Sequence, residues 1–157
     1  MTGGAVLTLD AAIAFAEALR RDRKRVVFTN GVFDLLHPGH VRYLRAARAE
    51  GDALIVGLNS DASVSAIKGP DRPLTPESER AEIIAALECV DAAVVFNEET
   101  PGEIIRQIQP DVLVKGADWA ADAIVGRDTV EARGGRVVRI PVEQGWSTSA
   151  IIEKVKA

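Results

Sequence analysis

Both histidines of the 157-residue chain lie within four positions of each other, at His37 and His40. Residues three positions apart share one face of a helix, so the two imidazoles would point the same way. Imidazole can bind a metal, act as a general base or donate hydrogen bonds to phosphoryl oxygens. A metal site needs further ligands, and neither Cys89 nor the carboxylates have a supporting spacing, so we expect no metal held by this pair. The other interpretation is that the two histidines only cap a helix.

A glycine turn precedes the pair. The residues up to Thr29 are typical of a strand, Gly31 follows after Asn30, and Pro38 suits the first turn of a helix. Free N–H groups and the positive end of the helix dipole would meet at the strand's carboxyl edge, which suits an anion. The chain has no G-x-G-x-x-G after this strand and no G-x-x-x-x-G-K-[ST], which argues against hydride transfer and Walker-type hydrolysis.

The elements that must position these residues alternate between short β-branched runs and longer stretches of helical spacing. This alternation predicts an α/β fold, a single Rossmann-like domain with a five-stranded parallel sheet and helices on both faces. The expected strands are Arg25–Thr29, Ala53–Leu58, Ala92–Phe96, Val112–Lys115 and Arg136–Ile140. We expect residues 1–24 to form an N-terminal helix packed on a domain of residues 25–157.

Helix signals separate the strands. Helices are expected at Asp10–Arg21, Pro38–Glu50, Thr75–Cys89, from Thr100, at Ile124–Gly134 and at Ser147–Lys156. The segment Lys68–Pro76 is the longest polar interruption and indicates either a functional loop or an ordinary surface turn.

Composition excludes several classes of protein. Twenty-three acidic and nineteen basic residues give a net charge of −4, and no basic tail stands out, so we expect no nucleic-acid partner. One cysteine excludes an internal disulfide framework. No apolar run reaches the roughly 20 residues that cross a bilayer, and the first ten residues lack a secretory signal. These features predict a cytoplasmic protein with no membrane partner.

The stretch from Gly31 to His40 resembles the G-x-F-D and H-x-G-H signatures of the cytidylyltransferase-like nucleotidyltransferases, which join a nucleoside monophosphate to a phosphorylated small molecule and release pyrophosphate. Further matching motifs follow in the order Lys68-Gly69, Arg72-Pro73, Glu79-Arg80, Val114 to Trp119 and Ser147-Thr148-Ser149. The series, from about Val26 to Lys156, is similar to the adenylyltransferases that make ADP-heptose from D-glycero-β-D-manno-heptose 1-phosphate. It implies the H-x-G-H nucleotidyltransferase fold, ATP as a substrate with Mg²⁺, and a place in lipopolysaccharide core precursor synthesis.

The resemblance also implies partners. Many relatives carry this domain behind a sugar kinase, for which 157 residues leave no room. We therefore expect the stand-alone form, with a separate sugar kinase upstream in the pathway. Small members of the family are commonly dimers, so a homodimer is expected.

By the same resemblance, His37 and His40 donate hydrogen bonds to phosphate oxygens, and no general base is needed. The expected phosphate clamps are Lys68 and Arg72. Nucleotide contacts are expected from Asn30, Gly31, Val32, Phe33, Gly39, Asn59, Lys115, Gly116, Asp118, Ser147 and Thr148.

Several of these residues also have structural interpretations. Asp118 suits a turn, Asn59 a helix cap before Asp61, and Ser147 a helix cap. Asp34 either holds Mg²⁺ through water or fixes the turn. Arg80 either faces the site or pairs with Glu77.

Two alternative functions stay open. One is a CTP-dependent glycerol-3-phosphate cytidylyltransferase, although that group carries an arginine and a threonine ahead of the glycine where this chain has Val142-Glu143-Gln144-Gly145-Trp146. The other is a catalytically silent nucleotide-sensing module, which would be expected to lack a histidine or a loop cation. The sequence assigns no role to Trp119 or Trp146, and it does not determine the base or the sugar's hydroxyl pattern.

Overall fold

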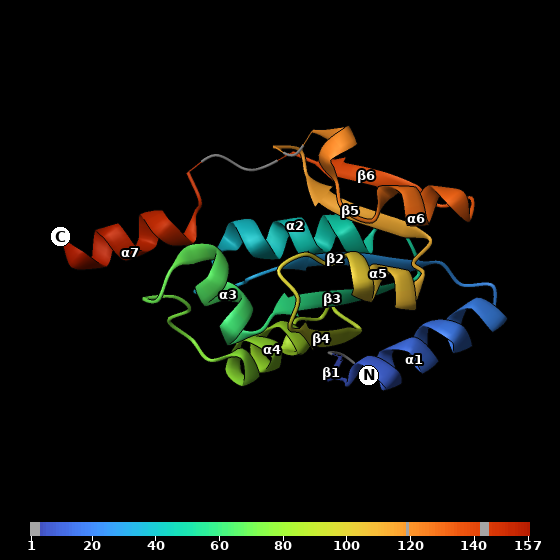
Figure 1. Ribbon diagram of the computed structural model, residues 1–157, viewed down its shortest axis with the longest axis horizontal. Helices are drawn as coiled ribbons and strands as arrows, with labels where there is room; N and C mark the ends of the chain where they lie inside the picture. The colour runs from blue at the N-terminus through green and yellow to red at the C-terminus, as the bar shows by residue number, and fades with distance from the viewer. Residues whose placement is uncertain (1–3, 119, 142–144) are drawn as a thin grey trace.

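A parallel sheet runs through the protein in the strand order β1-β4-β3-β2-β5-β6 (Figure 1). The computed structural model describes residues 4–118, 120–141 and 145–157. The strands are β1 (Ala5–Val6), β2 (Val26–Gly31), β3 (Ala53–Asn59), β4 (Ala92–Phe96), β5 (Val112–Gly116) and β6 (Arg136–Ile140). The α/β class, the parallel sheet and the four strands from β2 to β5, as well as β6, are confirmed within two residues at their ends.

Helices cover both faces of the sheet. They are α1 (Leu9–Arg21), α2 (Pro38–Arg48), α3 (Asp61–Lys68), α4 (Glu77–Ala86), α5 (Gly102–Ile108), α6 (Arg127–Ala132) and α7 (Thr148–Lys156), with a 3-10 turn at Ala121–Ala123. None of the helices in the described part of the chain is both long enough and apolar enough to cross a membrane.

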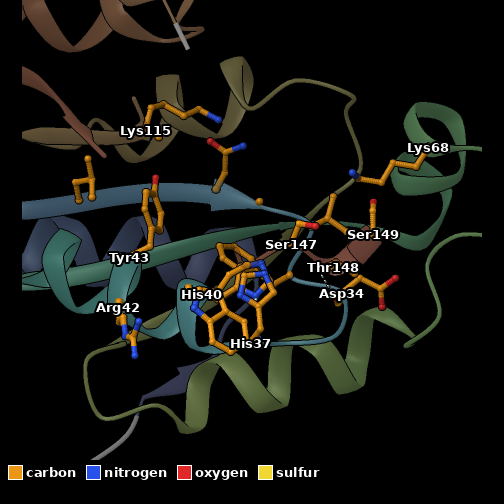
Figure 2. Close-up of a pocket in the computed structure, with 18 of the residues that line it drawn as sticks. Asp34, His37, His40, Arg42, Tyr43, Lys68, Lys115, Ser147, Thr148 and Ser149 are labelled. Carbon is orange, nitrogen blue, oxygen red and sulfur yellow. Dashed lines mark hydrogen bonds between the residues drawn. The ribbon is translucent and has the colours of Figure 1, made fainter. Parts of the chain in front are cut away.

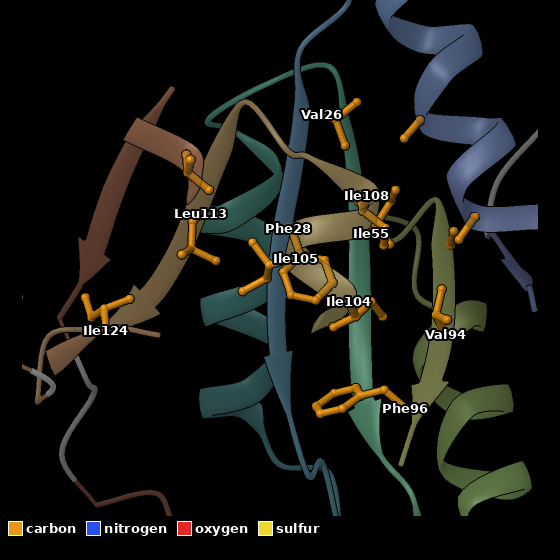
Figure 3. Close-up of a cluster of buried hydrophobic side chains, with 14 residues drawn as sticks. Val26, Phe28, Ile55, Val94, Phe96, Ile104, Ile105, Ile108, Leu113 and Ile124 are labelled. Carbon is orange, nitrogen blue, oxygen red and sulfur yellow. The ribbon is translucent and has the colours of Figure 1, made fainter. Parts of the chain in front are cut away.

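Two buried apolar clusters hold these layers together, because successive strand residues point to opposite faces. In the first cluster, Phe28 and Ile55 meet Ile105 and Ile108 of α5 (Figure 3). In the second, which lies on the other face, the neighbouring residue Val27 packs with residues of α2 and α4. Full burial of one such side chain stabilises the fold by about 1.5–3 kcal/mol.

The strand order reverses at β2, between β3 and β5. After β2 the chain adds β3 and β4 on one side, and then returns to place β5 on the other. The β2–β5 register pairs Val27 with Val112 and Phe28 with Leu113, whereas the β2–β3 register continues to Gly31. A crevice therefore opens between the carboxyl ends of β2 and β5, the place where such sheets bind ligands.

The sequence-based expectation of five strands is wrong by one. Ala5–Val6 pairs in parallel with β4 as a sixth, edge strand, so the first 24 residues contribute a strand as well as the helix α1. Two residues are too few to show an alternating pattern, which is why the sequence did not reveal this strand.

For helix α3 the sequence predicted no range, only a candidate cap at Asn59 before Asp61. The helix is held by a capping bond in which Ser60 Oγ accepts the N–H of Ser63 at 3.2 Å. Other helix ends differ by a few residues: α2 ends at Arg48, α4 spans Glu77–Ala86 with Pro76 as its cap, and α6 begins at Arg127. Helix α5 likewise starts at Gly102 with Pro101 as its cap.

Candidate functional site

A cavity of about 520 Å³ lies at the carboxyl ends of β2 and β5 (Figure 2). It is lined by Asn30, Gly31, Val32, Phe33, Asp34, His37, Gly39, His40, Arg42, Tyr43, Lys68, Arg72, Lys115, Gly116, Ile140, Pro141, Trp146, Ser147, Thr148 and Ser149. All the predicted site residues except Asn59 and Asp118 are in this lining.

The two histidines lie side by side at the start of α2. Their rings are stacked, with centroids 3.8 Å apart and planes 21° from parallel. The backbone N–H of His37 donates to Nδ1 of His40 at 3.2 Å. A neutral imidazole that accepts at Nδ1 carries its proton on Nε2, so His40 keeps an Nε2–H donor.

Both imidazoles favour the neutral form. Burial, together with the nearby charge of His37, lowers the pKa of His40 to about 4. Burial also lowers the pKa of His37 below its usual 6.5. At neutral pH both rings are therefore uncharged. Each can donate an N–H hydrogen bond to a phosphate oxygen without adding a positive charge.

Asp34 anchors the turn that leads to the histidines. Its neighbours Phe33 and Leu35 both have left-handed backbone angles, with φ of 52° and 55°. The Asp34 carboxylate is buried and accepts hydrogen bonds from Arg72 Nε at 3.0 Å, Leu74 N at 2.8 Å and Thr75 N at 3.0 Å. Asp34 thus ties the turn to the loop that follows α3.

The bonding of Asp34 also sets its charge state. Burial raises the pKa of this carboxyl, but the two backbone hydrogen bonds and Arg72 outweigh burial and lower it below the usual value. The side chain is wholly buried and its oxygens are engaged, so it does not suit an Mg²⁺ ligand. Of the two interpretations of Asp34, the structure favours fixing the turn.

The described ranges contain no group of three or more histidine, cysteine, aspartate or glutamate residues that could hold a metal ion. Mg²⁺ is expected from the resemblance as the companion of ATP, and we assign it no protein ligand.

Two basic residues reach the cavity from the end of α3 and from the loop that follows it. Lys68 is the last residue of α3, and Figure 2 shows its side chain directed toward the cavity. Arg72 lies four residues later, and its Nε is bound by Asp34. This bond fixes the plane of the guanidinium without using its two terminal nitrogens. The loop Lys68–Pro76 is thus held against the cavity rather than being a remote surface turn.

A second helix N-terminus faces the first. Ser147 caps α7, and its Oγ accepts the N–H of Ala150 at 3.0 Å. Thr148 Oγ1 donates to the backbone oxygen of Asp34 at 2.6 Å, which joins α7 to the turn before α2. The cavity therefore lies between the N-termini of α2 and α7, both of which favour an anion.

Sequence reasoning missed the floor of the cavity. The Tyr43 hydroxyl lies 2.8 Å from Thr29 Oγ1 and donates to the backbone oxygen of Val114 at 3.3 Å, so it bridges β2 and β5 where they diverge. Burial raises the pKa of Tyr43 to about 12. The available signal was helical spacing, because Tyr43 follows His40 by three positions. Arg42, Ile140, Pro141 and Ser149 also line the cavity without having been predicted to.

Beside the floor, Lys115 lies at the end of β5, where burial lowers its pKa and nearby Asp118 opposes that shift. Asp118 is outside the lining. Asn59 is too, since its Nδ2 donates to Ser63 Oγ at 2.9 Å. The cap of α3 is Ser60 and not Asn59. Trp119 and residues 142–144 lie outside the described residues.

Arg80 is buried outside the cavity and binds the backbone of segments that form the site. Its guanidinium donates to the backbone oxygens of Thr75, Val32 and Asn59 at 2.8–2.9 Å. It also pairs with Asp61 at 2.9 Å, and not with the glutamate that begins α4. Arg80 therefore positions the glycine turn and the loop, and it does not line the cavity.

Comparisons with known proteins identify the family to which this chain belongs. A family model described as cytidylyltransferase-like matches residues 28–154. The chain is 54% identical over 151 residues to "Bifunctional protein HldE" of Geotalea uraniireducens, and 48% identical over 154 residues to the protein of that name from Gluconobacter oxydans. These matches cover 96% and 98% of this chain, but only 31% and 32% of those proteins. The chain thus spans just under a third of the length of these relatives.

A solved structure is also similar. It is described as the lipopolysaccharide core biosynthesis protein of Thermoplasma volcanium, and it is 28% identical with a TM-score of 0.62. The match covers 76% of this chain and 97% of the other.

Proposed function

Because this chain belongs to the cytidylyltransferase-like family and is a nucleotidyltransferase, we propose that it transfers AMP from ATP to D-glycero-β-D-manno-heptose 1-phosphate. The products would be ADP-heptose and pyrophosphate. The observation that carries the proposal is the neutral, stacked pair of His37 and His40 in a cavity between two helix N-termini. The likeness to proteins named HldE and to a lipopolysaccharide core biosynthesis protein supports the choice of sugar.

The reaction needs positioning and charge stabilisation more than acid–base help. An oxygen of the sugar phosphate attacks the α-phosphorus of ATP, a new P–O bond forms, and the bond to the β-phosphate oxygen breaks in line with it. The nucleophile is already an anion at neutral pH, so no proton has to be removed. The leaving pyrophosphate takes the electron pair of the broken bond.

The residues of the cavity would stabilise the negative charge that develops on the phosphate oxygens during the reaction. The imidazole N–H groups of His37 and His40 donate to the phosphate oxygens on which negative charge develops. Lys68 and Arg72 reach the phosphates from the loop, while the N-terminus of α7 contributes its free N–H groups and Thr148. These cations concentrate positive potential at the cavity of a chain whose net charge is −4.

A two-by-two assay tests the proposal. The protein is incubated with ATP or CTP, each combined with heptose 1-phosphate or glycerol 3-phosphate, and pyrophosphate release is measured. We expect release with ATP and heptose 1-phosphate. Release only with CTP and glycerol 3-phosphate would instead identify a cytidylyltransferase, and nucleotide binding without release from any pair would identify a sensing module.

The proposed substrate also implies a supplier. A sugar 1-phosphate must come from a reaction that phosphorylates the anomeric carbon, so we propose that a sugar kinase precedes this step. A homodimer stays a prediction, which sedimentation can test.

Replacing Lys68 with alanine should weaken ATP binding about 10-fold, because one charge-assisted contact to a phosphate is lost. Isothermal titration calorimetry measures the change. Lys24→Ala is the matched control, since Lys24 is exposed before the start of β2 and outside the lining. Equal ATP affinity in the wild-type and Lys68→Ala proteins would show that the loop cation does not bind phosphate.

A further inference from the structure

A column of four aromatic rings forms part of the cavity wall. The indole of Trp146 lies 6.0 Å from the imidazole of His37, centroid to centroid, with the planes 18° from parallel. His37 stacks in turn on His40 at 3.8 Å, and His40 meets Phe33 edge-on at 5.4 Å. The column therefore places the donor pair between a tryptophan from the segment before α7 and a phenylalanine from the glycine turn.

The two imidazoles are oriented in different ways. His40 is fixed by a hydrogen bond, because its Nδ1 accepts the backbone N–H of His37. Nδ1 of His37 is buried and has no hydrogen-bond partner in the described part of the chain. A functional histidine usually has its ring fixed by a bond to the nitrogen that does not act. His37 lacks that bond, so the orientation of its ring depends on the rings that stack on it.

Gly39 makes room for this stacking. A β-carbon at Gly39 would lie 2.9 Å from the His37 ring and 2.9 Å from Cβ of Trp146. Contacts that short do not occur, so any other residue here would push the indole or the imidazole away. The glycine, which the sequence suggested would admit a ligand, is thus also needed for the contact between Trp146 and His37.

We propose that Trp146 is a positioning residue, whose indole holds the His37 imidazole in the orientation that donates to phosphate. The proposal rests on the phosphoryl-donor role given to His37 in the proposed function. It also links the last helix to catalysis. None of the α7 residues is buried, and its first residue, Thr148, is tied to the backbone oxygen of Asp34. This bond holds the N-terminus of α7 beside the turn, and Trp146, two residues earlier, then stacks on His37. The same contact therefore positions both the anion site of α7 and the donor ring.

Steady-state kinetics of Trp146→Leu and Trp146→Phe test the role. We expect Leu to lower kcat about 10-fold while the KM for ATP changes less than about threefold, because Lys68 and the helix N-termini still bind the triphosphate. Phe keeps a stacking ring and should retain at least half of the wild-type kcat. The matched control is Val155→Ala, a change at an apolar residue of α7 that is 79% exposed, and it should leave both constants unchanged.

A second readout needs no substrate. The chain has two histidines, so NMR resolves two imidazole titrations, and His40→Gln assigns them. Burial lowers the pKa of His37, so removing the indole should raise that pKa toward 6.5 in Trp146→Leu but not in Trp146→Phe. This result would stand even if the sugar substrate were wrong.

Three outcomes would overturn the proposal. The first is an unchanged kcat in Trp146→Leu, and the second is equal loss of kcat in the Leu and Phe variants. The third is a rise in the KM for ATP alone with an unmoved His37 titration, which would make the indole a nucleotide contact.

Discussion

Replacing His40 with alanine should lower kcat by roughly 100- to 1000-fold, the usual cost of deleting one preorganised donor to a developing oxyanion. His40 carries its proton on Nε2, because its Nδ1 accepts the N–H of His37. Its pKa of about 4 keeps the ring neutral in a neutral assay, so the variant loses a hydrogen-bond donor and no charge. Pyrophosphate release under saturating substrates measures the change.

Two comparisons make this prediction specific. The fold should survive, because the side chain makes one local hydrogen bond at the helix start, so the circular dichroism spectrum of His40→Ala should match that of the wild type. His40→Gln can place an amide N–H near the position of Nε2, and it should recover part of the lost rate. A wild-type rate in His40→Ala would show that the donor assignment is wrong.

Replacing Asp34 with alanine should destabilise the protein by about 3 kcal/mol and also weaken ATP binding. The change leaves the N–H groups of Leu74 and Thr75 and the Nε of Arg72 without their acceptor. The loop that carries Lys68 and Arg72 then loses its attachment to the turn. Urea unfolding measures the stability, and calorimetry measures the affinity for ATP.

The matched control is Asp71→Ala, since Asp71 is an exposed aspartate of the same loop. It should change the free energy of unfolding by less than about 0.5 kcal/mol. Equal stability losses in the two variants would contradict the anchoring role of Asp34.

The pH dependence of the free energy of unfolding should show the same role of Asp34. The folded pKa of Asp34 lies below its unfolded value of 3.8, so its stabilising contribution is complete above that value and is lost as the pH falls through the folded pKa. Asp34→Ala should therefore lose less stability than the wild type between pH 4 and pH 2.

The strands that build the site could be predicted from sequence, because a buried parallel strand is a continuous apolar run that few other structures share. The buried strand Ala92–Phe96 has the predicted bounds. So does Arg136–Ile140, a partly exposed edge strand in which two arginines flank two valines. The two-residue strand β1 could not be predicted, since its pairing with β4 is a contact between segments more than 80 residues apart. Helix α3 is short, and its start depends on a single side-chain bond at Ser60.

The sequence by itself determined which chemistry is at hand: two histidines three residues apart, a glycine turn before a helix and two loop cations. These are local facts, because backbone geometry within one turn or one strand end follows from neighbouring residues. Only the tertiary structure decided what each side chain bonds to. Asp34 binds the loop after α3, and Arg80 binds backbone oxygens outside the cavity. Tyr43 forms part of the cavity floor, and Trp146 stacks on His37. Those partners come from distant parts of the chain, and only packing of the whole fold brings them within bonding distance.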